Sequence, residues 1–493
     1  MSMIQVSHLT FGYEGSFDNI FEDVSFQIDT DWKLGFIGRN GRGKTTFLNL
    51  LLGRYEYTGT ITHSVEFEYF PYPVEDREEM TLTILEGIAP EAQLWEIQRE
   101  LSLLEVEEGV LYRPFSTLSN GEQTKTLLAA LFLKENRFLL IDEPTNHLDT
   151  LAREKVGEYL AGKKGFILVS HDRAFLDRCV DHVLSINRAD IEVQRGNYSS
   201  WQQNKDRQDQ RELAENEQLK KDIKRLEQAA RRTAGWSDAV EKTKKGTRNA
   251  GLRPDRGFIG HKAAKMMKRA KSIEARREDA AQEKAELLHN LEQAGRLKLP
   301  YTPYYKETLL EATDLSLFYG EKIAVKEVSF TVKRGERVAL VGRNGSGKSS
   351  ILKFLLGEEV KASGTLRMGS GLMLSYVPQD TSSLAGEMRA FIQREGLDES
   401  LFKAILRKLD FSRAQLEKPL EALSQGQKKK ILLARSLCQP AHLYIWDEPL
   451  NYVDLISRTQ IEVLIEEFQP TMLFVEHDRM FCEKVATKQV LLG

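Results

Sequence analysis

The chain has 493 residues, of which 41% are hydrophobic and 29% are charged, and it carries a net charge of -3 at pH 7. This composition is typical of a soluble globular protein with about three domains and excludes a disordered or fibrous chain. The longest apolar run, residues 127–133, is far shorter than the roughly 18 residues that a membrane span requires. The start of the chain lacks a signal-peptide pattern, and its three cysteines lack CxxC spacing, so we expect a cytoplasmic protein without disulfides or a zinc site.

The first motif with clear chemistry is a glycine-rich loop near the start of the chain. An apolar run at 34–37 leads directly into the segment GRNGRGKT at 38–45. This strand, loop and helix order is that of a P-loop, whose backbone N–H groups and helix N-terminus surround phosphates. Lys44 would reach the β- and γ-phosphates, and Thr45 would offer its hydroxyl to Mg²⁺. The other ATP-binding residues of this loop would be Gly38, Asn40, Gly41, Gly43 and Thr46.

Further motifs follow this loop, at 118–123 (LSNGEQ), 138–144 (FLLIDEP) and 169–172 (VSHD). Four apolar residues before Asp142 and Glu143 fit a buried parallel strand, which would deliver Asp142 to the metal and Glu143 to the attacking water. Taken alone, the two carboxylates could be a solvated strand end, and His171 could be an ordinary surface or core histidine. Their order behind a P-loop favours the catalytic interpretation.

The same series of motifs returns in the second half of the chain. Lys348 stands 304 residues after Lys44, and His477 stands 306 residues after His171, which indicates a repeat of a whole domain. The second P-loop contributes Gly342, Asn344, Gly345, Gly347, Lys348, Ser349 and Ser350, and the later motifs contribute Gln379, Ser424, Gly426, Asp447, Glu448 and His477.

An aromatic residue precedes the first long strand of each copy, Tyr13 in the first and Tyr319 in the second. Either tyrosine alone could simply pack against a strand. The match in both copies favours a binding role: in ATP-binding-cassette ATPases, which these motifs resemble, an aromatic residue here stacks on adenine, so the resemblance implies that each ring does so.

A long polar segment separates the two copies. Residues 201–300 contain 25 Lys and Arg against 16 Asp and Glu, whereas the rest of the chain carries a net charge of -12. Residues 201–232 and 261–293 lack Gly and Pro and are rich in helix formers, which predicts two helices around a Gly- and Pro-broken tip. Between 231 and 271 there are 13 basic and 3 acidic residues, as expected for a segment that binds a polyanion such as a nucleic acid. The simpler alternative is a solvated coiled coil.

The motifs resemble the signature, Walker B, D-loop and switch-histidine motifs of ATP-binding-cassette ATPases. The resemblance implies an α/β fold, with one ATPase domain at 1–199, a helical hairpin linker at 200–303 and a second ATPase domain at 304–493. It also implies ATP and Mg²⁺ as cofactors and a monomer whose two domains pair head to tail. The implied catalytic residues are Glu143, His171, Glu448 and His477, the metal-side residues are Thr45, Asp142, Ser349, Gln379 and Asp447, and Ser119, Gly121, Ser424 and Gly426 would bind the ATP of the opposite domain.

Two cassettes, no membrane domain and a basic hairpin between them resemble the ABC-F proteins, cytosolic ATPases that bind the ribosome. The resemblance implies that the hairpin enters the tRNA exit site of a bacterial ribosome and approaches large-subunit rRNA and peptidyl tRNA, with no membrane partner and no DNA. The expected RNA-contacting tip residues are Arg248, Arg253, Arg256, Phe258, His261, Lys262, Lys265, Lys268 and Arg269.

The second copy departs from the first at three motifs. Gln379 corresponds to Tyr72, the segment PLNYVD at 449–454 replaces PTNHLD, and Glu476 replaces Ser170 before the switch histidine, so we expect unequal ATP sites. These variants, a short 72–118 stretch with little room for an inserted arm, and an abrupt end at 493 resemble the Lsa and Vga type of resistance protein.

That resemblance implies protection of the peptidyl-transferase centre from lincosamides, streptogramin A and pleuromutilins by drug displacement. A housekeeping translation factor remains the close alternative. A transporter ATPase, which would need a separate membrane partner, and a DNA-directed ATPase are the more distant ones.

Overall fold

The computed structural model describes residues 2–13, 19–134, 136–146, 148–187, 190–208, 300, 302–409 and 411–492, with scattered positions between 210 and 224. The chain divides into two compact units, Met1–Trp201 with Arg296–Gly493, and Gln202–Gly295. Residues 198–208 are helical, in the region where the sequence predicts the outgoing linker helix. The linker tip, with all nine of its predicted RNA-contacting residues, and the returning helix lie outside the described residues.

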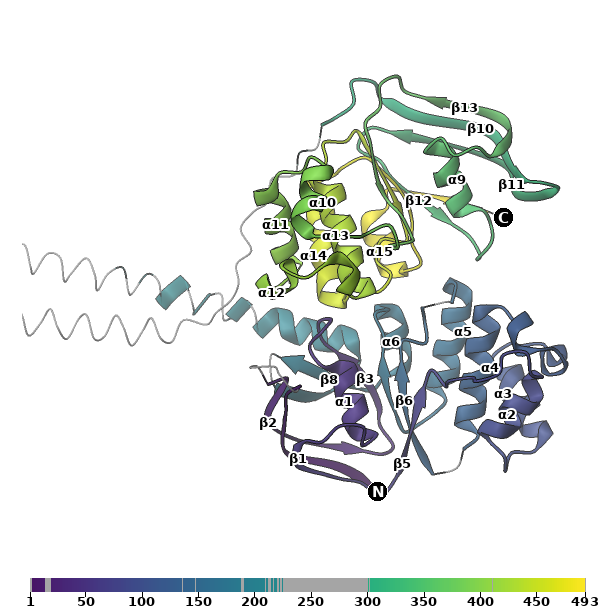
Figure 1. Ribbon diagram of the computed structural model, residues 1–493, viewed down its shortest axis with the longest axis vertical. Coiled ribbons are helices and arrows are strands. Elements are labelled where there is room, and N and C mark those ends of the chain that lie inside the picture. Colours follow the sequence, from purple (N-terminus) through teal and green to yellow (C-terminus); the bar gives the residue numbers. More distant parts are fainter. Residues whose placement is uncertain are drawn as a thin grey trace, which may run out of the picture. The chain divides into compact units, whose positions relative to one another are not determined.

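The first copy is built on two sheets (Figure 1). A three-stranded antiparallel sheet has the order β2-β1-β4, and a six-stranded sheet has the order β5-β6-β7-β3-β8-β9, in which only the β8–β9 pair is antiparallel. The strands are β1 (Met3–Phe11), β2 (Phe21–Asp29), β3 (Lys33–Ile37), β4 (Thr58–Thr62), β5 (Glu66–Phe70), β6 (Arg137–Asp142), β7 (Phe166–Val169), β8 (His182–Asn187) and β9 (Asp190–Arg195).

Helices cover both faces of the six-stranded sheet. They are α1 (Lys44–Leu51), α2 (Thr81–Ile88), α3 (Leu94–Leu103), α4 (Asn120–Phe132), α5 (Thr150–Ala161) and α6 (Arg173–Cys179), with short 3₁₀ helices η1 (Glu108–Tyr112) and η2 (Phe115–Thr117). Alternate residues of β6 enter different cores: Phe138 and Leu140 pack with α1 and the antiparallel sheet, whereas Leu139 and Ile141 pack with the other helices. Burial on both faces explains why this strand reads as an uninterrupted apolar run.

The second copy repeats this plan. Its antiparallel sheet has the order β11-β10-β13, and its parallel sheet has the order β14-β15-β16-β12-β17. The strands are β10 (Thr308–Tyr319), β11 (Lys322–Lys333), β12 (Arg337–Val341), β13 (Lys361–Met368), β14 (Leu374–Val377), β15 (Leu443–Asp447), β16 (Met472–Val475) and β17 (Lys488–Leu491). The helices are α9 (Lys348–Leu355), α10 (Met388–Arg394), α11 (Glu399–Lys408), α12 (Arg413–Leu416), η3 (Leu420–Ala422), α13 (Gln425–Cys438), α14 (Leu455–Phe468) and α15 (Arg479–Val485).

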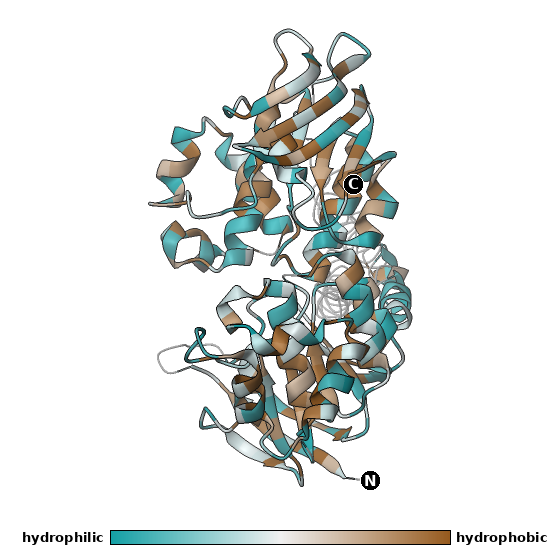
Figure 2. Ribbon diagram, turned by 90° about the vertical axis from the view of Figure 1, so that its right-hand side faces the viewer, coloured by the Kyte–Doolittle hydropathy of each residue, from teal (hydrophilic) through white to brown (hydrophobic). Residues whose placement is uncertain are grey.

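The predicted α/β class with two tandem domains is therefore confirmed. Figure 2 shows apolar residues concentrated on the interior strands and helices of each copy. In both copies the P-loop lysine begins a helix and the Walker B aspartate ends a central parallel strand. Carboxyl ends of parallel strands share one sheet edge, which is where ligands of such sheets bind. Among the described residues, no helix has the length and apolarity needed to cross a bilayer.

Candidate ATP sites

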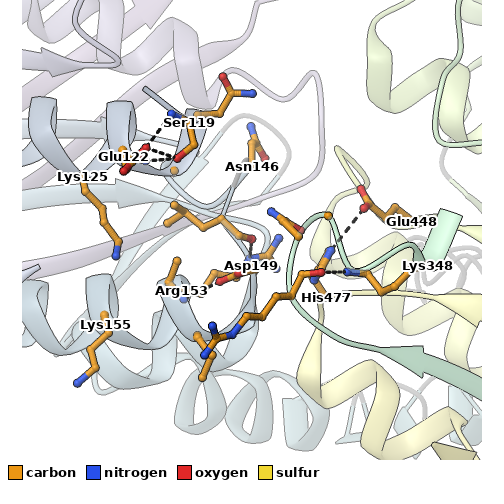
Figure 3. Close-up of a pocket in the computed structure, with 18 of the residues that line it drawn as sticks. Ser119, Glu122, Lys125, Asn146, Asp149, Arg153, Lys155, Lys348, Glu448 and His477 are labelled. Atoms are coloured by element: carbon orange, nitrogen blue, oxygen red, sulfur yellow. Dashed lines mark hydrogen bonds and ion pairs between the residues drawn. The ribbon is translucent and has the colours of Figure 1, made fainter. Parts of the chain in front are cut away.

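The P-loops lie in two cavities, each lined by residues from both copies. The cavity around Lys44, called site one, has a volume of about 590 Å³, and the cavity around Lys348, called site two, has a volume of about 1340 Å³. Site one includes Tyr13, Asn40, Gly41, Gly43, Lys44, Thr45, Thr46, Asp142, Glu143 and His171 of the first copy with Ser424 and Gly426 of the second. Site two includes Tyr319, Asn344, Gly345, Gly347, Lys348, Ser349, Ser350, Gln379, Glu448 and His477 with Ser119 and Gly121 of the first copy (Figure 3).

Glycine shapes both loops at the start of the helix. Gly43 and Gly347 have φ angles of 97° and 84°, in the left-handed region that L side chains rarely adopt. A Cβ on Gly347 would lie 2.4 Å from the backbone oxygen of Ala324, so even alanine cannot fit there. The loops therefore bring backbone N–H groups close to whatever lies at the helix N-terminus, which suits a phosphate.

The P-loop lysines are buried and folded back onto their own loops. Lys44 Nζ donates hydrogen bonds to the backbone oxygens of Gly38, at 2.7 Å, and Arg39, at 3.2 Å. Lys348 Nζ donates to the backbone oxygens of Gly342 and Arg343, both at 2.8 Å. Burial lowers the pKa of both ammonium groups below its usual value. Gly38 and Gly342 thus support the lysines through their carbonyl groups.

The predicted metal-side residues are paired in both sites. Thr45 Oγ1 donates to Asp142 Oδ2, and Ser349 Oγ donates to Asp447 Oδ1, each at 3.1 Å. Burial raises the pKa of Asp142, and it raises the pKa of Asp447 to about 6. A cation would relieve the cost of ionising these carboxylates.

This donor set suits Mg²⁺, which is commonly held by one or two carboxylates together with substrate phosphates and water. The described residues contain no cluster of three or more His, Cys, Asp or Glu side chains that could form an all-protein metal cage. Hydroxyl and carboxylate oxygens on this edge of each sheet would hold the metal, which would supply charge neutralisation for the phosphates.

The candidate catalytic glutamates stand in strained backbone conformations directly after the strands β6 and β15. Glu143 has a φ of 50° and Glu448 a φ of 45°. Their N–H groups donate to Val169 O at 2.9 Å and Val475 O at 3.0 Å, so the strand pairing holds the turn in place. Left-handed conformations at non-glycine residues cost on the order of 1–3 kcal/mol and cluster at functional sites. Both copies retain this strain at the same residue.

The two glutamates differ in their hydrogen bonds. Glu448 Oε2 accepts from Gln379 Nε2 at 2.8 Å and from Asn451 Nδ2, and Glu448 Oε1 lies 3.4 Å from His477 Nε2. Glu143 Oε1 lies 3.2 Å from His171 Nε2, but neither of its buried oxygens has a partner in hydrogen-bond geometry within the described part of the chain.

Their protonation differs accordingly. Burial and the neighbouring Asp142 raise the pKa of Glu143 to about 8. Burial also acts to raise the pKa of Glu448, but hydrogen bonds from His477 and Gln379 outweigh it and hold that pKa below its usual value. Burial and the Lys44 ammonium lower the pKa of His171 well below its usual value. The surroundings thus favour the ionised form of Glu448 and the protonated form of Glu143.

The structure also brings a residue to site one that the sequence reasoning missed. Tyr69 OH donates to Asp142 Oδ2 at 3.0 Å and lines the cavity with Pro71. Tyr72, which aligns with Gln379, packs against the helical core of the first copy and is not among the residues of this cavity. The repeat already showed a tyrosine at both 69 and 376, but its contact with the aspartate has no local sequence signal.

Two departures of the second copy compensate for each other. In the first copy the hydroxyls of Thr145 and Ser170 lie 3.2 Å apart and hydrogen-bond. In the second copy Leu450 has no hydroxyl, and the carboxylate of Glu476 accepts instead from the Leu450 N–H at 3.0 Å. The hydroxyl–hydroxyl hydrogen bond of the first copy is thus replaced in the second copy by a hydrogen bond between a carboxylate and a backbone N–H group.

Residues of the opposite copy approach site one closely. Asn40 Nδ2 donates to the backbone oxygen of Tyr452 at 2.7 Å, and a Cβ on Gly426 would lie 2.3 Å from that same oxygen. The ring of Tyr13 lies edge-on to Phe11 and Tyr55, and its hydroxyl is 2.9 Å from Thr46 Oγ1. The expected position of the two tyrosines before the first long strand is wrong, because Tyr13 follows β1 and Tyr319 is the last residue of β10. Both rings remain partly exposed at their cavities, as an aromatic platform for a base requires.

Comparison with known proteins agrees with this geometry. The family model described as ABC transporter matches the chain twice, at residues 21–146 and 325–451. These matches cover the P-loop and Walker B residues of both copies and together span about half of the chain.

Relatives of similar architecture align along nearly the whole chain. The ribosome protection protein VmlR of Bacillus subtilis is 29% identical over 98% of this chain and 85% of its own length. The ATP-binding protein Uup of Caulobacter vibrioides is 28% identical over 96% and 74%, and the energy-dependent translational throttle protein EttA of Haemophilus influenzae is 25% identical over 95% and 88%. Among solved structures, the archaeal ribosome recycling factor aABCE1 superposes with a TM-score of 0.62 at 18% identity over 98% of this chain and 87% of that one.

Proposed function

We propose that this chain, an ATP hydrolase of the ATP-binding-cassette family and within it of the ABC-F proteins, protects the bacterial ribosome from antibiotics. The drugs would be those of the peptidyl-transferase centre, namely lincosamides, streptogramin A and pleuromutilins. The observation that carries this proposal is similarity over 98% of the chain to a relative named as a ribosome protection protein.

We propose that ATP binds in both cavities with its phosphates at the P-loop and its γ-phosphate near the signature loop of the opposite copy. Lys44 and Lys348 would exchange their backbone carbonyl partners for phosphate oxygens. Glu143 and Glu448 would orient the attacking water, and His171 and His477 would hold the reacting geometry. ATP bound between the copies would draw them together, and hydrolysis would release them.

We propose that residues 200–303, between the two ATPase domains, are the part of this cytoplasmic, monomeric protein that reaches the tRNA exit site. The excess of 13 basic over 3 acidic residues between 231 and 271 supports binding to rRNA and peptidyl tRNA. Arg253 and Phe258 would offer faces for unstacked bases, as recognition of irregular RNA requires.

The first experiment changes Glu143 and Glu448 together to Gln. We expect the doubly changed protein to bind ATP but not to turn it over, to co-sediment with ribosomes and to slow growth. Normal hydrolysis by this variant would contradict the catalytic assignment, and co-sedimentation with membranes or DNA in place of ribosomes would contradict the partner.

The second experiment measures inhibitory concentrations of the three drug classes in a sensitive bacterium that expresses the chain. Phe258→Ala or Arg253→Ala should abolish protection while ATPase activity and ribosome binding remain. Lys or Arg changes at 262–269 should weaken ribosome binding in a salt-dependent way. Full protection by a chain with residues 248–260 replaced by a Gly/Ser linker would rule out the role of the tip.

A housekeeping translation factor is the second candidate. Its support is that Uup and EttA resemble the chain almost as closely as VmlR does. The two functions separate in the same drug assay, because a housekeeping factor would leave all inhibitory concentrations unchanged while its deletion would alter growth or translation.

A further inference from the structure

A buried lysine connects the signature helix of the second copy to the reacting groups of site two. Lys429 lies in the second turn of α13, and its side chain is 1% exposed. Its Nζ donates to the backbone oxygens of Pro378 at 2.7 Å, Gln379 at 3.1 Å and Asp447 at 3.4 Å. An ammonium group has three donors, so these three carbonyl groups satisfy it completely.

These contacts fix two segments that matter for hydrolysis. Gln379 hydrogen-bonds Glu448, and Asp447 accepts from Ser349, so the ammonium supports the backbone beneath both side chains. The start of the same helix faces the other site, because Ser424 and Gln425 line site one. Gln425 Oε1 also accepts from Thr381 Oγ1 at 2.5 Å, which ties the segment after Gln379 to the helix a second time.

A second buried charged residue, Glu476, likewise has an uncharged counterpart in the first copy. Glu476 is 6% exposed and, among the nearby carboxylates, acts most strongly to raise the pKa of Lys429 against the lowering effect of burial. Its oxygens accept from the N–H groups of Leu450 and His477. A buried charged group is costly unless it is hydrogen-bonded, and both of these groups are hydrogen-bonded to backbone groups.

The first copy has uncharged residues at the two positions that align with Lys429 and Glu476. Thr124 aligns with Lys429, and its hydroxyl donates to the backbone oxygen of Asn120 in its own helix, at 2.9 Å. Ser170 aligns with Glu476 and bonds Thr145. Both members of the pair therefore differ together between the copies.

We propose that Lys429 is a positioning residue of site two, whose ammonium sets the backbone that carries Gln379 and Asp447. Among the described residues of the first copy, the aligned Thr124 bonds within its own helix, so the link from the reacting groups of site two to the helix that begins at site one is a feature of the second copy. The inference rests on the proposed roles of Gln379 and Asp447 in ATP hydrolysis and is independent of any ribosomal role.

The kinetic test uses the full chain with one site inactivated. In a Glu143→Gln background, Lys429→Thr should lower kcat at least about tenfold while the KM for ATP changes less than about threefold, because misplaced groups cost rate more than binding. Lys429→Arg, which keeps the charge, should recover part of the loss. In a Glu448→Gln background, where only site one reacts, Lys429→Thr should change kcat less than about threefold. Lys428→Thr on the same helix is the matched control and should leave both backgrounds unchanged.

A double-mutant cycle tests whether Lys429 and Glu476 act together. Lys429→Thr with Glu476→Ser should lose less activity than the product of the two single losses, because two buried groups of opposite charge are then removed together. Equal losses in both backgrounds, or independent effects of the two changes, would overturn the proposal.

Amide hydrogen exchange supplies a measurement that needs no turnover. In nucleotide-free Lys429→Thr, exchange should accelerate in residues 376–381 and stay unchanged in residues 69–74 of the first copy. Unchanged protection at 376–381 would overturn the positioning role. This measurement does not depend on the activity of the Glu143→Gln and Glu448→Gln backgrounds. Inactivity of those backgrounds would count only against the proposed ATP-site roles.

Discussion

Arg173 forms a buried ion cluster between the two copies, and removing its charge should destabilise the protein strongly. The guanidinium of Arg173, in the first copy, makes two hydrogen bonds to the carboxylate of Glu462 and lies 3.6 Å from Asp478 Oδ2, both in the second copy. The three side chains are between 0% and 7% exposed. The equivalent residue of the second copy, Arg479, is 59% exposed and pairs with Glu154 and Glu483 at the surface.

The expected magnitudes follow from burial. Removing one partner of a buried ion pair costs about 3–5 kcal/mol, whereas an exposed pair contributes about 0–1 kcal/mol. Lys484 still lies 3.3 Å from Glu462 and Arg458 still lies 2.9 Å from Asp478, so the carboxylates keep some compensation. We therefore expect Arg173→Met to cost about 3 kcal/mol and Arg479→Met less than about 1 kcal/mol.

Thermal unfolding followed by circular dichroism measures the difference. For an unfolding unit of roughly 150–250 residues, about 3 kcal/mol corresponds to a Tm lowered by about 6–12 °C, and Arg479→Met should lower it by less than about 4 °C. Arg173→Met combined with Glu462→Met should regain most of the loss, since an apolar pair replaces a broken ionic one. Equal small shifts for the two arginine variants, or no recovery in the double variant, would refute the reasoning.

The same cluster predicts how the effect depends on pH. Burial acts to raise the pKa of Asp478, but Arg458 and Arg173 outweigh it and hold the pKa below the usual aspartate value of 3.8. A lowered carboxyl pKa contributes stability that is present above the unfolded value and is lost as pH falls through the folded value. The Tm difference between the wild type and Arg173→Met should therefore be constant near neutral pH and shrink below about pH 4.

Three other predictions concern the ATP sites. In Glu448→Gln only site one reacts, and in Glu143→Gln only site two reacts. The rate of site one should rise over a higher pH range than the rate of site two, because the pKa of Glu143 is raised to about 8 and that of Glu448 is lowered. Coincident pH–rate profiles of the two variants would contradict this. Gly426→Ala should lower turnover at site one at least about tenfold, because its Cβ would lie 2.3 Å from Tyr452 O, and normal turnover in the Glu448→Gln background would contradict it. Removing Mg²⁺ with EDTA should abolish turnover at both sites while fluorescent ATP analogues still bind, and metal-independent turnover would contradict the roles of Asp142 and Asp447.

Local sequence patterns predicted the P-loops and the strands that carry the Walker B carboxylates, whereas the fold class and the remaining cavity residues followed from the resemblance to a family. The P-loops, the apolar strands before Asp142 and Asp447, and the constant spacing between copies are short-range or periodic signals. The pairing of Ser424 with Lys44 followed only from resemblance to a family, since no pattern within either copy shows which surface the other copy meets.

Contacts between distant residues had no such signal. Tyr69 on Asp142 and Arg173 on Glu462 each join segments far apart in the sequence, and no local motif predicts either contact. The alignment of the two copies displays the change from Ser170 to Glu476, but only the fold shows that this carboxylate faces the Leu450 N–H. Such long-range polar contacts depend on the packed structure and not on local propensity.

The differences between the copies favour the ionised form of the candidate catalytic glutamate at site two over that at site one. At site two, Gln379 and Asn451 hydrogen-bond Glu448, and His477 and Gln379 hold its pKa below the usual value. At site one, Glu143 lacks these hydrogen bonds among the described residues, and its raised pKa disfavours the ionised form. Burial and the neighbouring Asp142 dominate at Glu143, whereas hydrogen bonds dominate at Glu448. If the two glutamates are the catalytic residues that we propose, Glu448 is the better oriented of the two, and we expect the two sites to hydrolyse ATP at different rates.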